Sequence, residues 1–270
     1  MLVADPAATR AHDCVRLAAA VREAGALVLK TFGGPIKSWT KHGDSPVSTA
    51  DIAVNELLHG RLADAATDYG WLSEESENDP ARLSKRRVWV VDPIDGTRAY
   101  LAGRADWSIS AALVEDGRPV VAAVFAPVTD ELFVAILGEG ATRNAAPMTA
   151  SVGSDLDGAR IAGPRRVLES LAIRRPGLVA MPRIGSLALR LVRLAQGEIE
   201  AAIAGGNGHD WDLAAADLLV HEAGGMLTAL DGKQLTYNRP DPVHGVLVAA
   251  GRERHVALLD LVRAQHDSSA

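Results

Sequence analysis

The chain has 270 residues, of which 48% are hydrophobic, enough for one large domain or two closely packed ones with a substantial core. Its formal net charge of -6 argues against nonspecific binding to nucleic acid, which requires a basic face. Cys14 is the single cysteine, which excludes an internal disulfide and a thiolate metal cluster. No apolar run approaches the roughly 20 residues of a membrane span, and no basic-then-apolar leader opens the sequence. We therefore expect a cytoplasmic protein that has neither nucleic acid nor a membrane as a partner.

The first part of the sequence predicts two helices followed by an antiparallel sheet. An alanine-rich amphipathic helix is expected over about 11–31, before Gly33 and Gly34, and a loop or short strand over 36–43. A second helix should run from a cap at Ser48 or Thr49 to about residue 66. Apolar runs bounded by turn residues predict strands over 88–91, 108–114, 120–125 and 132–136.

The composition turns to small and polar residues over 149–160, where we place the boundary between two halves. Beyond it, strands are expected over 160–163, 178–181, 199–203 and 246–250, and helices over 167–173, 186–196, 212–223 and up to about 265. This alternation predicts an α+β half over 1–156 and an α/β half over 157–270. The halves should pack as one rigid unit with the site in the cleft between them.

Two carboxylates come directly after the apolar run 88–91. Asp92 and Asp95 are separated by Pro93, whose fixed φ favours a turn, and Gly96 permits a close backbone approach. Two anionic side chains this close repel each other unless a divalent cation neutralises them, and oxygen ligands suit magnesium or manganese better than zinc. The amides of 95–97 lie where a helix could start and could receive a phosphate. A plain Asx-Pro turn that caps a helix would use the same residues.

Further acidic residues accompany this motif. Glu74 and Glu75 lie about 20 residues upstream. Asp51 falls in the first turn of the second expected helix, where an acid is favourable for the helix dipole alone. Far downstream, Asp212 follows Trp211 and opens a helical segment that a pair of glycines ends.

Together these segments resemble the inositol monophosphatase superfamily, the lithium-sensitive, magnesium-dependent phosphatases. The central motif is DPIDGT at 92–97, and the second signature covers 211–225, at the separation that this superfamily requires. The resemblance covers most of the chain. It implies a layered α-β-α-β-α sugar-phosphatase fold, of the α+β and α/β classes, and hydrolysis of a phosphate monoester.

The resemblance also implies which residues bind metal. Glu74, Asp92 and the carbonyl of Ile94 would hold one Mg²⁺ ion, and Asp92, Asp95 and Asp212 would hold a second. A third, more loosely held ion contacts Glu74 in many relatives, and Mn²⁺ is an expected substitute. Most ligands would come from the first half, whereas the second half would supply Asp212 and one wall of the substrate cleft.

The catalytic group implied by the resemblance is Thr97, Asp51 and Glu74. Thr97, hydrogen-bonded to Asp51, resembles the pair that positions and deprotonates the attacking water, although Thr97 can also be a plain helix cap. The residues expected to contact the substrate and its phosphate are Asp95, Gly96, Thr97, Gly185, Ser186 and Asp212.

The sequence leaves the roles of two polar residues open. Glu75 is the least certain acid, because adjacent residues on an extended segment point in opposite directions. His209 lies just before Trp211 and could contact the substrate, but it is interpreted as a surface-loop histidine, since no second histidine lies at ligand spacing.

The substrate depends on a short stretch before the second signature. Inositol monophosphatases usually carry a glutamate there that binds ring hydroxyls, whereas residues 204–208 here are Ala-Gly-Gly-Asn-Gly. A pocket without that acceptor loses hydrogen bonds to a polyol. Together with 230–238, these glycines resemble the bacterial phosphatases that remove the 3′-phosphate from 3′-phosphoadenosine 5′-phosphate. We therefore expect a bisphosphate nucleotidase, with an inositol-1-monophosphatase as the alternative.

Other functions stay open. Histidinol phosphate and fructose 1,6-bisphosphate are further candidate substrates within the same chemistry. The non-enzyme alternative is a pseudoenzyme that binds a phosphorylated ligand without turnover, and the presence of the complete set of acids argues against it. Relatives are often dimers, so a homodimer is open by analogy.

Overall fold

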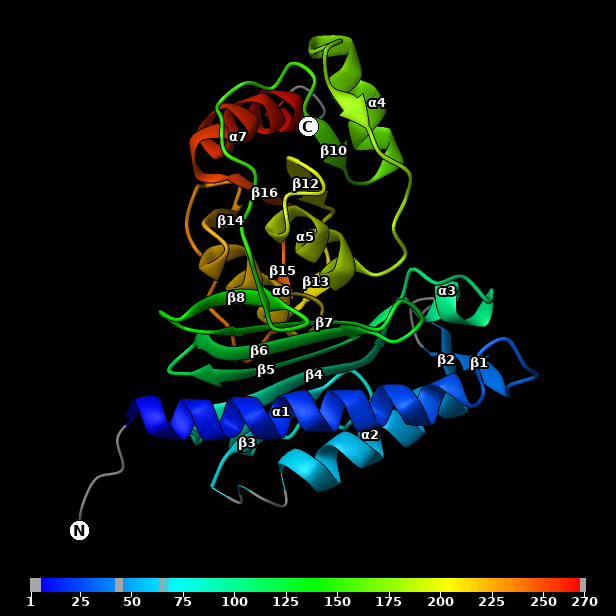
Figure 1. The fold of residues 1–270 in the computed structure, drawn as a ribbon. Coiled ribbons are helices and arrows are strands. Elements are labelled where there is room, and N and C mark those ends of the chain that lie inside the picture. The colour runs from blue at the N-terminus through cyan, green and yellow to red at the C-terminus, as the bar shows by residue number, and fades with distance from the viewer. Residues whose placement is uncertain (1–5, 42–45, 64–65, 67, 268–270) are drawn as a thin grey trace.

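Helices and sheets alternate in five layers. The computed structural model describes residues 6–41, 46–63, 66 and 68–267. Helices α1 (Pro6–Leu29) and α2 (Thr49–Leu62) cover a seven-stranded sheet, whose other face packs on α5 (Leu187–Ala195) and α6 (Asp210–Glu222). A five-stranded sheet follows, covered by α4 (Arg165–Arg174) and α7 (Arg252–Asp267) (Figure 1). The layered α-β-α-β-α fold predicted from the sequence is confirmed.

The larger sheet is built from residues 70–148. Its strands lie in chain order: β3 (Gly70–Ser73), β4 (Arg87–Asp95), β5 (Ser108–Glu115), β6 (Arg118–Ala126), β7 (Glu131–Ile136), β8 (Gly140–Arg143) and β9 (Ala146–Met148). β3 runs parallel to β4, and the other neighbours are antiparallel. The four predicted strands are β4 to β7, whereas the short strands β3, β8 and β9 were not predicted.

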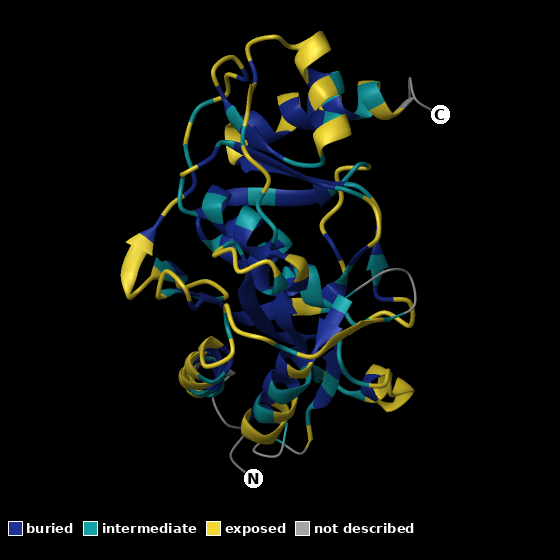
Figure 2. Cartoon of the chain, turned by 90° about the vertical axis from the view of Figure 1, so that its right-hand side faces the viewer, coloured by how far each residue is buried: buried dark blue, intermediate teal, exposed yellow. Residues whose placement is uncertain are grey.

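Both faces of this sheet are covered, which explains the continuous apolar runs in the sequence. On β4, Trp89 and Val91 belong to the core formed with α1 and α2, whereas Val88 and Val90 belong to the core formed with α5 and α6. This alternation is the two-residue period of a strand. The long strands β4, β5 and β6 are almost entirely buried, whereas exposed residues lie mainly on outer helices, loops and short strands (Figure 2).

The smaller sheet is built from residues 160–251. Its order is β11 (Val179–Ala180), β10 (Arg160–Ala162), β12 (Ala201–Ala204), β16 (Leu247–Gly251) and β14 (Gly225–Ala229). β10 is parallel to both of its neighbours, and β16 is antiparallel to both of its own. The sequence prediction missed β14, because its first glycine was assigned to the end of the preceding helix. The division of the chain at residue 156 stays a prediction.

Short elements complete the fold. β1 (Ser38–Thr40) pairs with β2 (Pro46–Ser48), and β13 (Gly208–His209) pairs with β15 (Val243–His244). The single-turn helices are the 3-10 helix η1 (Pro80–Ser84) and α3 (Thr97–Leu101). Ser48 caps α2 as predicted, because its Oγ accepts a hydrogen bond from Ala50 N at 3.2 Å. α1 begins earlier than expected and α2 ends earlier.

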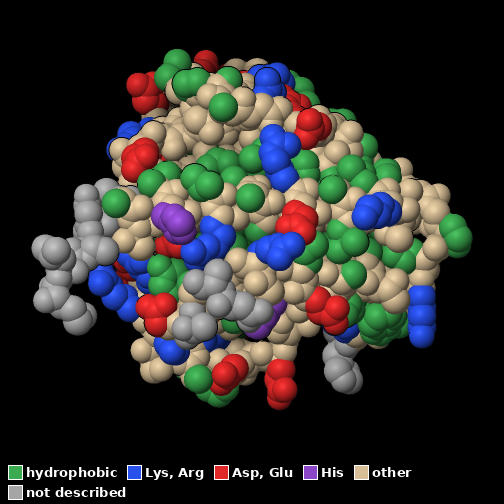
Figure 3. All heavy atoms as spheres, turned by 60° about the horizontal axis from the view of Figure 1, so that its bottom comes forward, with side chains coloured by type: hydrophobic (Ala, Val, Ile, Leu, Met, Phe, Trp, Pro, Cys, Tyr) green, Lys and Arg blue, Asp and Glu red, His purple; other side chains and the backbone are tan. Residues whose placement is uncertain are grey.

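The outer face of α1 and α2 carries acidic and basic side chains interspersed (Figure 3). Arg61 pairs with Glu23 at 2.7 Å and Arg22 with Asp130 at 3.0 Å. Behind this face Cys14 is buried, and burial raises the pKa of its thiol to about 11. Among the described residues, no helix is both long and apolar enough to cross a bilayer.

Candidate active site

A β-bulge at the end of β4 turns two aspartates to the same side of the sheet. Asp92 lies opposite Ser110 on β5 and Asp95 lies opposite Ser108, so β4 has one residue more than β5 between these pairs. In a regular strand, positions three apart point to opposite faces. Pro93 lies inside the bulge, where its missing N–H breaks no ladder hydrogen bond. The extra residue therefore places both carboxylates on one face.

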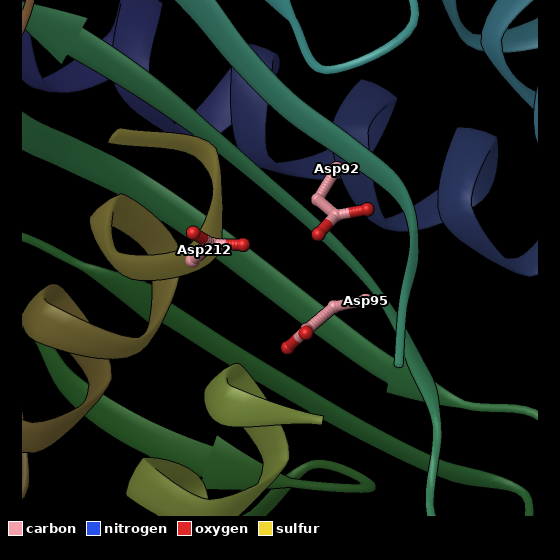
Figure 4. A group of neighbouring side chains, drawn as sticks. All are labelled: Asp92, Asp95 and Asp212. Carbon is pink, nitrogen blue, oxygen red and sulfur yellow. The ribbon is translucent and has the colours of Figure 1, made fainter. Parts of the chain in front are cut away.

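Asp212 reaches the same point from the first turn of α6. Its Oδ2 accepts a hydrogen bond from His209 N at 2.6 Å, which completes a capping box. Oxygen atoms of Asp92, Asp95 and Asp212 lie within 4.8 Å of one another. The three carboxylates point into a common space between β4 and α6 (Figure 4).

Asp95 also joins β4 to α5. Its Oδ2 accepts hydrogen bonds from Ser186 Oγ and Ala188 N, both at 2.6 Å, and its Oδ1 accepts one from Leu187 N at 3.2 Å. The aspartate thus satisfies amides that a helix start leaves unpaired. Ser186 caps α5 and is fully buried. Its predicted substrate contact stays a prediction.

Burial and like charge oppose simultaneous ionisation of these acids. Burial raises the pKa of Asp92 well above its ordinary value, and the neighbouring Glu74, Asp95 and Asp212 raise it further. Burial likewise raises the pKa of Asp95 to about 7 and that of Glu74 to about 7. A divalent cation would supply the missing positive charge, and the all-oxygen donor set suits Mg²⁺ or Mn²⁺. The acids therefore form a candidate site for a divalent cation.

Glu74 and Glu75 follow β3, and both lie near Lys41. Glu74 N donates to Val91 O at 3.2 Å, which holds Glu74 beside β4. Glu75 forms an ion pair with Lys41, and its side chain is 2% exposed. Lys41 Nζ also lies 3.9 Å from Glu74 Oε1. Lys41 had no role in the sequence prediction, because nothing local in the sequence indicates an acidic partner so far along the chain.

Thr97 and Asp51 are in hydrogen-bond contact, as the resemblance implied. Thr97 Oγ1 lies 3.2 Å from Asp51 Oδ1 and 3.1 Å from Ile94 O, so its single proton has two acceptors. Asp51 Oδ2 accepts hydrogen bonds from Ser48 N at 2.7 Å and Ser48 Oγ at 2.6 Å. Burial raises the pKa of Asp51, while these hydrogen bonds act in the opposite direction. The catalytic roles of both residues stay predictions.

Glycine is required where α3 meets α5. Gly96 has a φ of +95°, and a Cβ there would lie 3.0 Å from Ser186 N and 3.2 Å from Gly185 C. A Cβ on Gly185 would lie 2.7 Å from Ala99 Cβ and 2.9 Å from Asp106 O. Backbone therefore packs directly on backbone here. The binding of phosphate by the amides of 96 and 97 stays a prediction.

His209 is partly exposed, as predicted, but the structure places it at the start of a helix and not in an open loop. His209 is the N-cap of α6, and its ring stacks on Trp211 with centroids 4.5 Å apart. The side chain is 38% exposed, and the Asp212 carboxylate raises the pKa of the imidazole. His209 therefore shields one side of the candidate metal ligand.

Asp210 was not singled out from the sequence, yet it fixes the turn that presents Asp212. It is fully buried, its Oδ1 lies 2.7 Å from His244 Nε2, and its Oδ2 accepts a hydrogen bond from Asn238 N at 2.7 Å. Arg82 reaches across from η1 and donates to Asn238 Oδ1 at 2.5 Å. An acid in the first turn of a helix is so common that the sequence offered no signal for this network.

Comparisons with known proteins identify a family and relatives for this chain. The inositol monophosphatase family model matches residues 11–267. A Streptomyces griseus protein named glucose-1-phosphate thymidylyltransferase is 36% identical over 231 residues, covering 81% of this chain and 86% of that protein. The inositol-1-monophosphatase of Bacillus subtilis is 28% identical over 226 residues, covering 80% of this chain and 85% of that protein. The solved structure of the Thermotoga maritima IMPase has a TM-score of 0.84 at 23% identity, covering 94% of this chain and 97% of that one. The chain therefore belongs to the inositol monophosphatase family.

Proposed function

We propose that this metal-dependent phosphomonoesterase uses Mg²⁺ to hydrolyse a small phosphorylated metabolite. The observation that carries the proposal is the convergence of Asp92, Asp95 and Asp212, three carboxylates within 4.8 Å of one another, two of them buried. Such a cluster is costly without a cation, and hydrolysis of a phosphate monoester requires concentrated positive charge.

The ligands of the ions would be Glu74, Asp92, Asp95 and Asp212, together with the carbonyl of Ile94. Bound Mg²⁺ would offset the charge of the phosphate oxygens and of the leaving alkoxide. Thr97 and Asp51 would take up the proton of the attacking water. Asp51, with its raised pKa, is a stronger base than an ordinary aspartate and lies 3.2 Å from the Thr97 hydroxyl. The amides of Gly96 and Thr97 would receive the phosphate.

Two substrates have specific support. Inositol 1-phosphate is the first candidate, because the Bacillus subtilis relative is named for that activity. The second candidate is 3′-phosphoadenosine 5′-phosphate, the first expectation from the sequence. It is favoured by the stretch Gly205 to Gly208, which lines the cavity beside Asp212 and offers no carboxylate to ring hydroxyls.

Phosphate release is the direct test. The purified protein is incubated with inositol 1-phosphate, 3′-phosphoadenosine 5′-phosphate, histidinol phosphate and fructose 1,6-bisphosphate, each with Mg²⁺ or with excess chelator. We expect release with Mg²⁺, none with chelator, and recovery when Mg²⁺ is restored. Undiminished activity in chelator would contradict the mechanism. A control with dTTP and glucose 1-phosphate should release no pyrophosphate, whereas release would indicate thymidylyl transfer.

A further inference from the structure

A buried arginine outside the candidate metal site is fixed at the edge of the larger sheet. Arg82 lies on η1 and is 2% exposed. A Cβ on Gly70, the first residue of the edge strand β3, would lie 3.2 Å from Arg82 Cα, so the two backbones are in close contact. Arg82 Nε donates a hydrogen bond to Asn78 Oδ1 at 2.8 Å. The guanidinium therefore has a defined position relative to this sheet.

The other donors of this guanidinium reach the segment 238–244. Arg82 Nη1 donates to Asn238 Oδ1 at 2.5 Å, and Nη2 donates to Arg239 O at 2.9 Å. Asn238 Nδ2 donates back to Arg82 O at 3.3 Å. These partners are neutral, and among the described residues Arg82 forms no ion pair. Its contacts therefore fix the start of this segment and do not form a direct salt bridge.

The same segment binds Asp210 through three contacts. Asn238 N donates to Asp210 Oδ2 at 2.7 Å, and His244 Nε2 lies 2.7 Å from Asp210 Oδ1. Asp210 N donates to Pro242 O at 2.9 Å. Asp210 is the first residue of α6 and Asp212 is the third, so both lie in one turn. The position of the segment therefore determines where the Asp212 carboxylate lies.

Asn238 joins the two sets of contacts. Its φ is +56°, in the left-handed region, which asparagine adopts more readily than most residues. In this conformation its backbone N–H donates to Asp210 while its side chain contacts Arg82. A displacement of the guanidinium is therefore transmitted to the first turn of α6 through a single residue.

We propose that Arg82 is a positioning residue for the candidate metal site, because through Asn238 it holds the first turn of α6 in place relative to the larger sheet. Asp212 lies in that turn, whereas Asp92 and Asp95 lie on the sheet. The inference rests on the proposed function in taking Asp212 as a ligand of Mg²⁺. Residues that orient metal ligands typically change metal affinity by about 10- to 100-fold when they are lost.

Titration calorimetry with Mg²⁺ alone tests the inference without a substrate. Asn238→Gly keeps the backbone N–H that binds Asp210 and tolerates the positive φ, so it removes the side chain that contacts Arg82. We expect the Kd for Mg²⁺ to rise about tenfold or more. The variant should fold, because Tyr237 N still donates to Gly117 O at 3.0 Å and anchors the segment.

Arg82→Lys tests the other side of the contact. It keeps the positive charge and loses the paired donors that reach Asn238 and Arg239 together. We expect its Kd for Mg²⁺ to rise by about the same factor as in Asn238→Gly. The double variant should have a Kd close to that of Arg82→Lys, because both changes break one contact. Two effects that multiply would overturn the connection through Asn238.

Matched controls separate positioning from stability. Asn144 also has a positive φ, +47°, and its Oδ1 accepts a hydrogen bond from Leu132 N at 2.8 Å. Arg254 is likewise buried, and its Nε donates to Asp155 O at 2.7 Å. Asn144→Gly and Arg254→Lys should lower Tm and leave the Kd for Mg²⁺ unchanged.

The outcomes distinguish this inference from the proposed function. If the wild type binds Mg²⁺ and both Arg82→Lys and Asn238→Gly bind it equally well, the positioning role is overturned and the proposed function stands. A wild type that binds no Mg²⁺ would overturn both. If the wild type binds Mg²⁺ but releases phosphate from no compound, only the proposed hydrolysis falls, and the titration still decides the role of Arg82. In the phosphate-release assay, we expect the two variants to need about tenfold more Mg²⁺ for half-maximal activity.

Discussion

The acids of the site differ in how far their oxygen atoms are already engaged. Among the described residues, Asp92 accepts a hydrogen bond from Ile94 N alone, at 3.0 Å, whereas both oxygens of Asp95 are engaged by α5. A carboxylate can accept about four hydrogen bonds, so Asp92 is buried with most of its capacity unused. That is costly in a protein interior unless a cation takes the place of the missing donors.

Removing one charge from the metal site should abolish turnover. Asp92→Asn and Asp212→Asn keep the shape of the side chain and lose the negative charge, and we expect each to lower kcat by about a thousandfold or more. The measurement is phosphate release at saturating Mg²⁺. Asp116→Asn, in an exposed turn, is the control and should leave kcat unchanged. Near-normal turnover in either site variant would remove that residue from the ligands.

The hydroxyl of Thr97 should matter for turnover and not for metal binding. Thr97→Ala leaves every carboxylate in place, so Mg²⁺ should bind as in the wild type while kcat falls by roughly a hundredfold or more. Thr97→Ser keeps the proton that reaches Asp51 and should recover most of the activity. Titration calorimetry gives the metal affinity. The structure makes Gly96, and not Thr97, the N-cap of α3. Normal turnover in Thr97→Ala would therefore leave Thr97 with a structural role only, in its hydrogen bonds to Asp51 and Ile94.

At the scale of elements, the site forms where helix starts meet a strand end. Asp95 caps α5 from β4, and Asp212 lies in the first turn of α6, so the acids are fixed by the packing of helices between the two sheets. Gly96 allows this approach, because its backbone lies against Ser186. Gly96 therefore permits the close approach of α5 to the end of β4.

Gly96→Ala should destabilise the protein more than the backbone conformation alone explains. Gly138 also has a positive φ, +83°, and a Cβ there would have no neighbour within 4 Å, whereas a Cβ on Gly96 would meet Ser186 N at 3.0 Å. Gly138→Ala should lower the free energy of unfolding by about 1 kcal/mol. Gly96→Ala should cost about 1–3 kcal/mol more from overpacking. Urea unfolding measures both, and equal losses would contradict the close contact.

At the scale of the whole molecule, the sequence predicted most of the larger sheet. Its strands are long apolar runs bounded by turn residues, so β4 to β7 were found within a few residues of their ends. The strand order of the smaller sheet, β11-β10-β12-β16-β14, could not be predicted, since alanine-rich strands of two to five residues carry no register signal.

The sequence predicted which acids form the site, but not how they are arranged in space. Motif residues such as Asp92 and Asp212 could be named because their spacing is specific. Their convergence depends on a bulge opposite Ser108 and Ser110, and the Lys41–Glu75 pair depends on chain segments that meet only after folding. These contacts are tertiary, and local patterns do not encode them.

Metal binding should strengthen, and should stabilise the protein more, as the pH rises from 6 to 8. In the metal-free protein the pKa values of Glu74 and Asp95 are both about 7, against 4.5 and 3.8 for the ordinary side chains. The folded state thus holds protons that the unfolded chain has lost, and the stability that these groups contribute disappears as the pH rises from about 4 through 7. Mg²⁺ must displace those protons, so at pH 6 it competes with them and at pH 8 it does not. We expect the Mg²⁺-induced rise in Tm to be larger at pH 8 than at pH 6, and to be lost in Asp212→Asn at both values. An equal rise at the two pH values would show that the acids are already ionised before the metal binds.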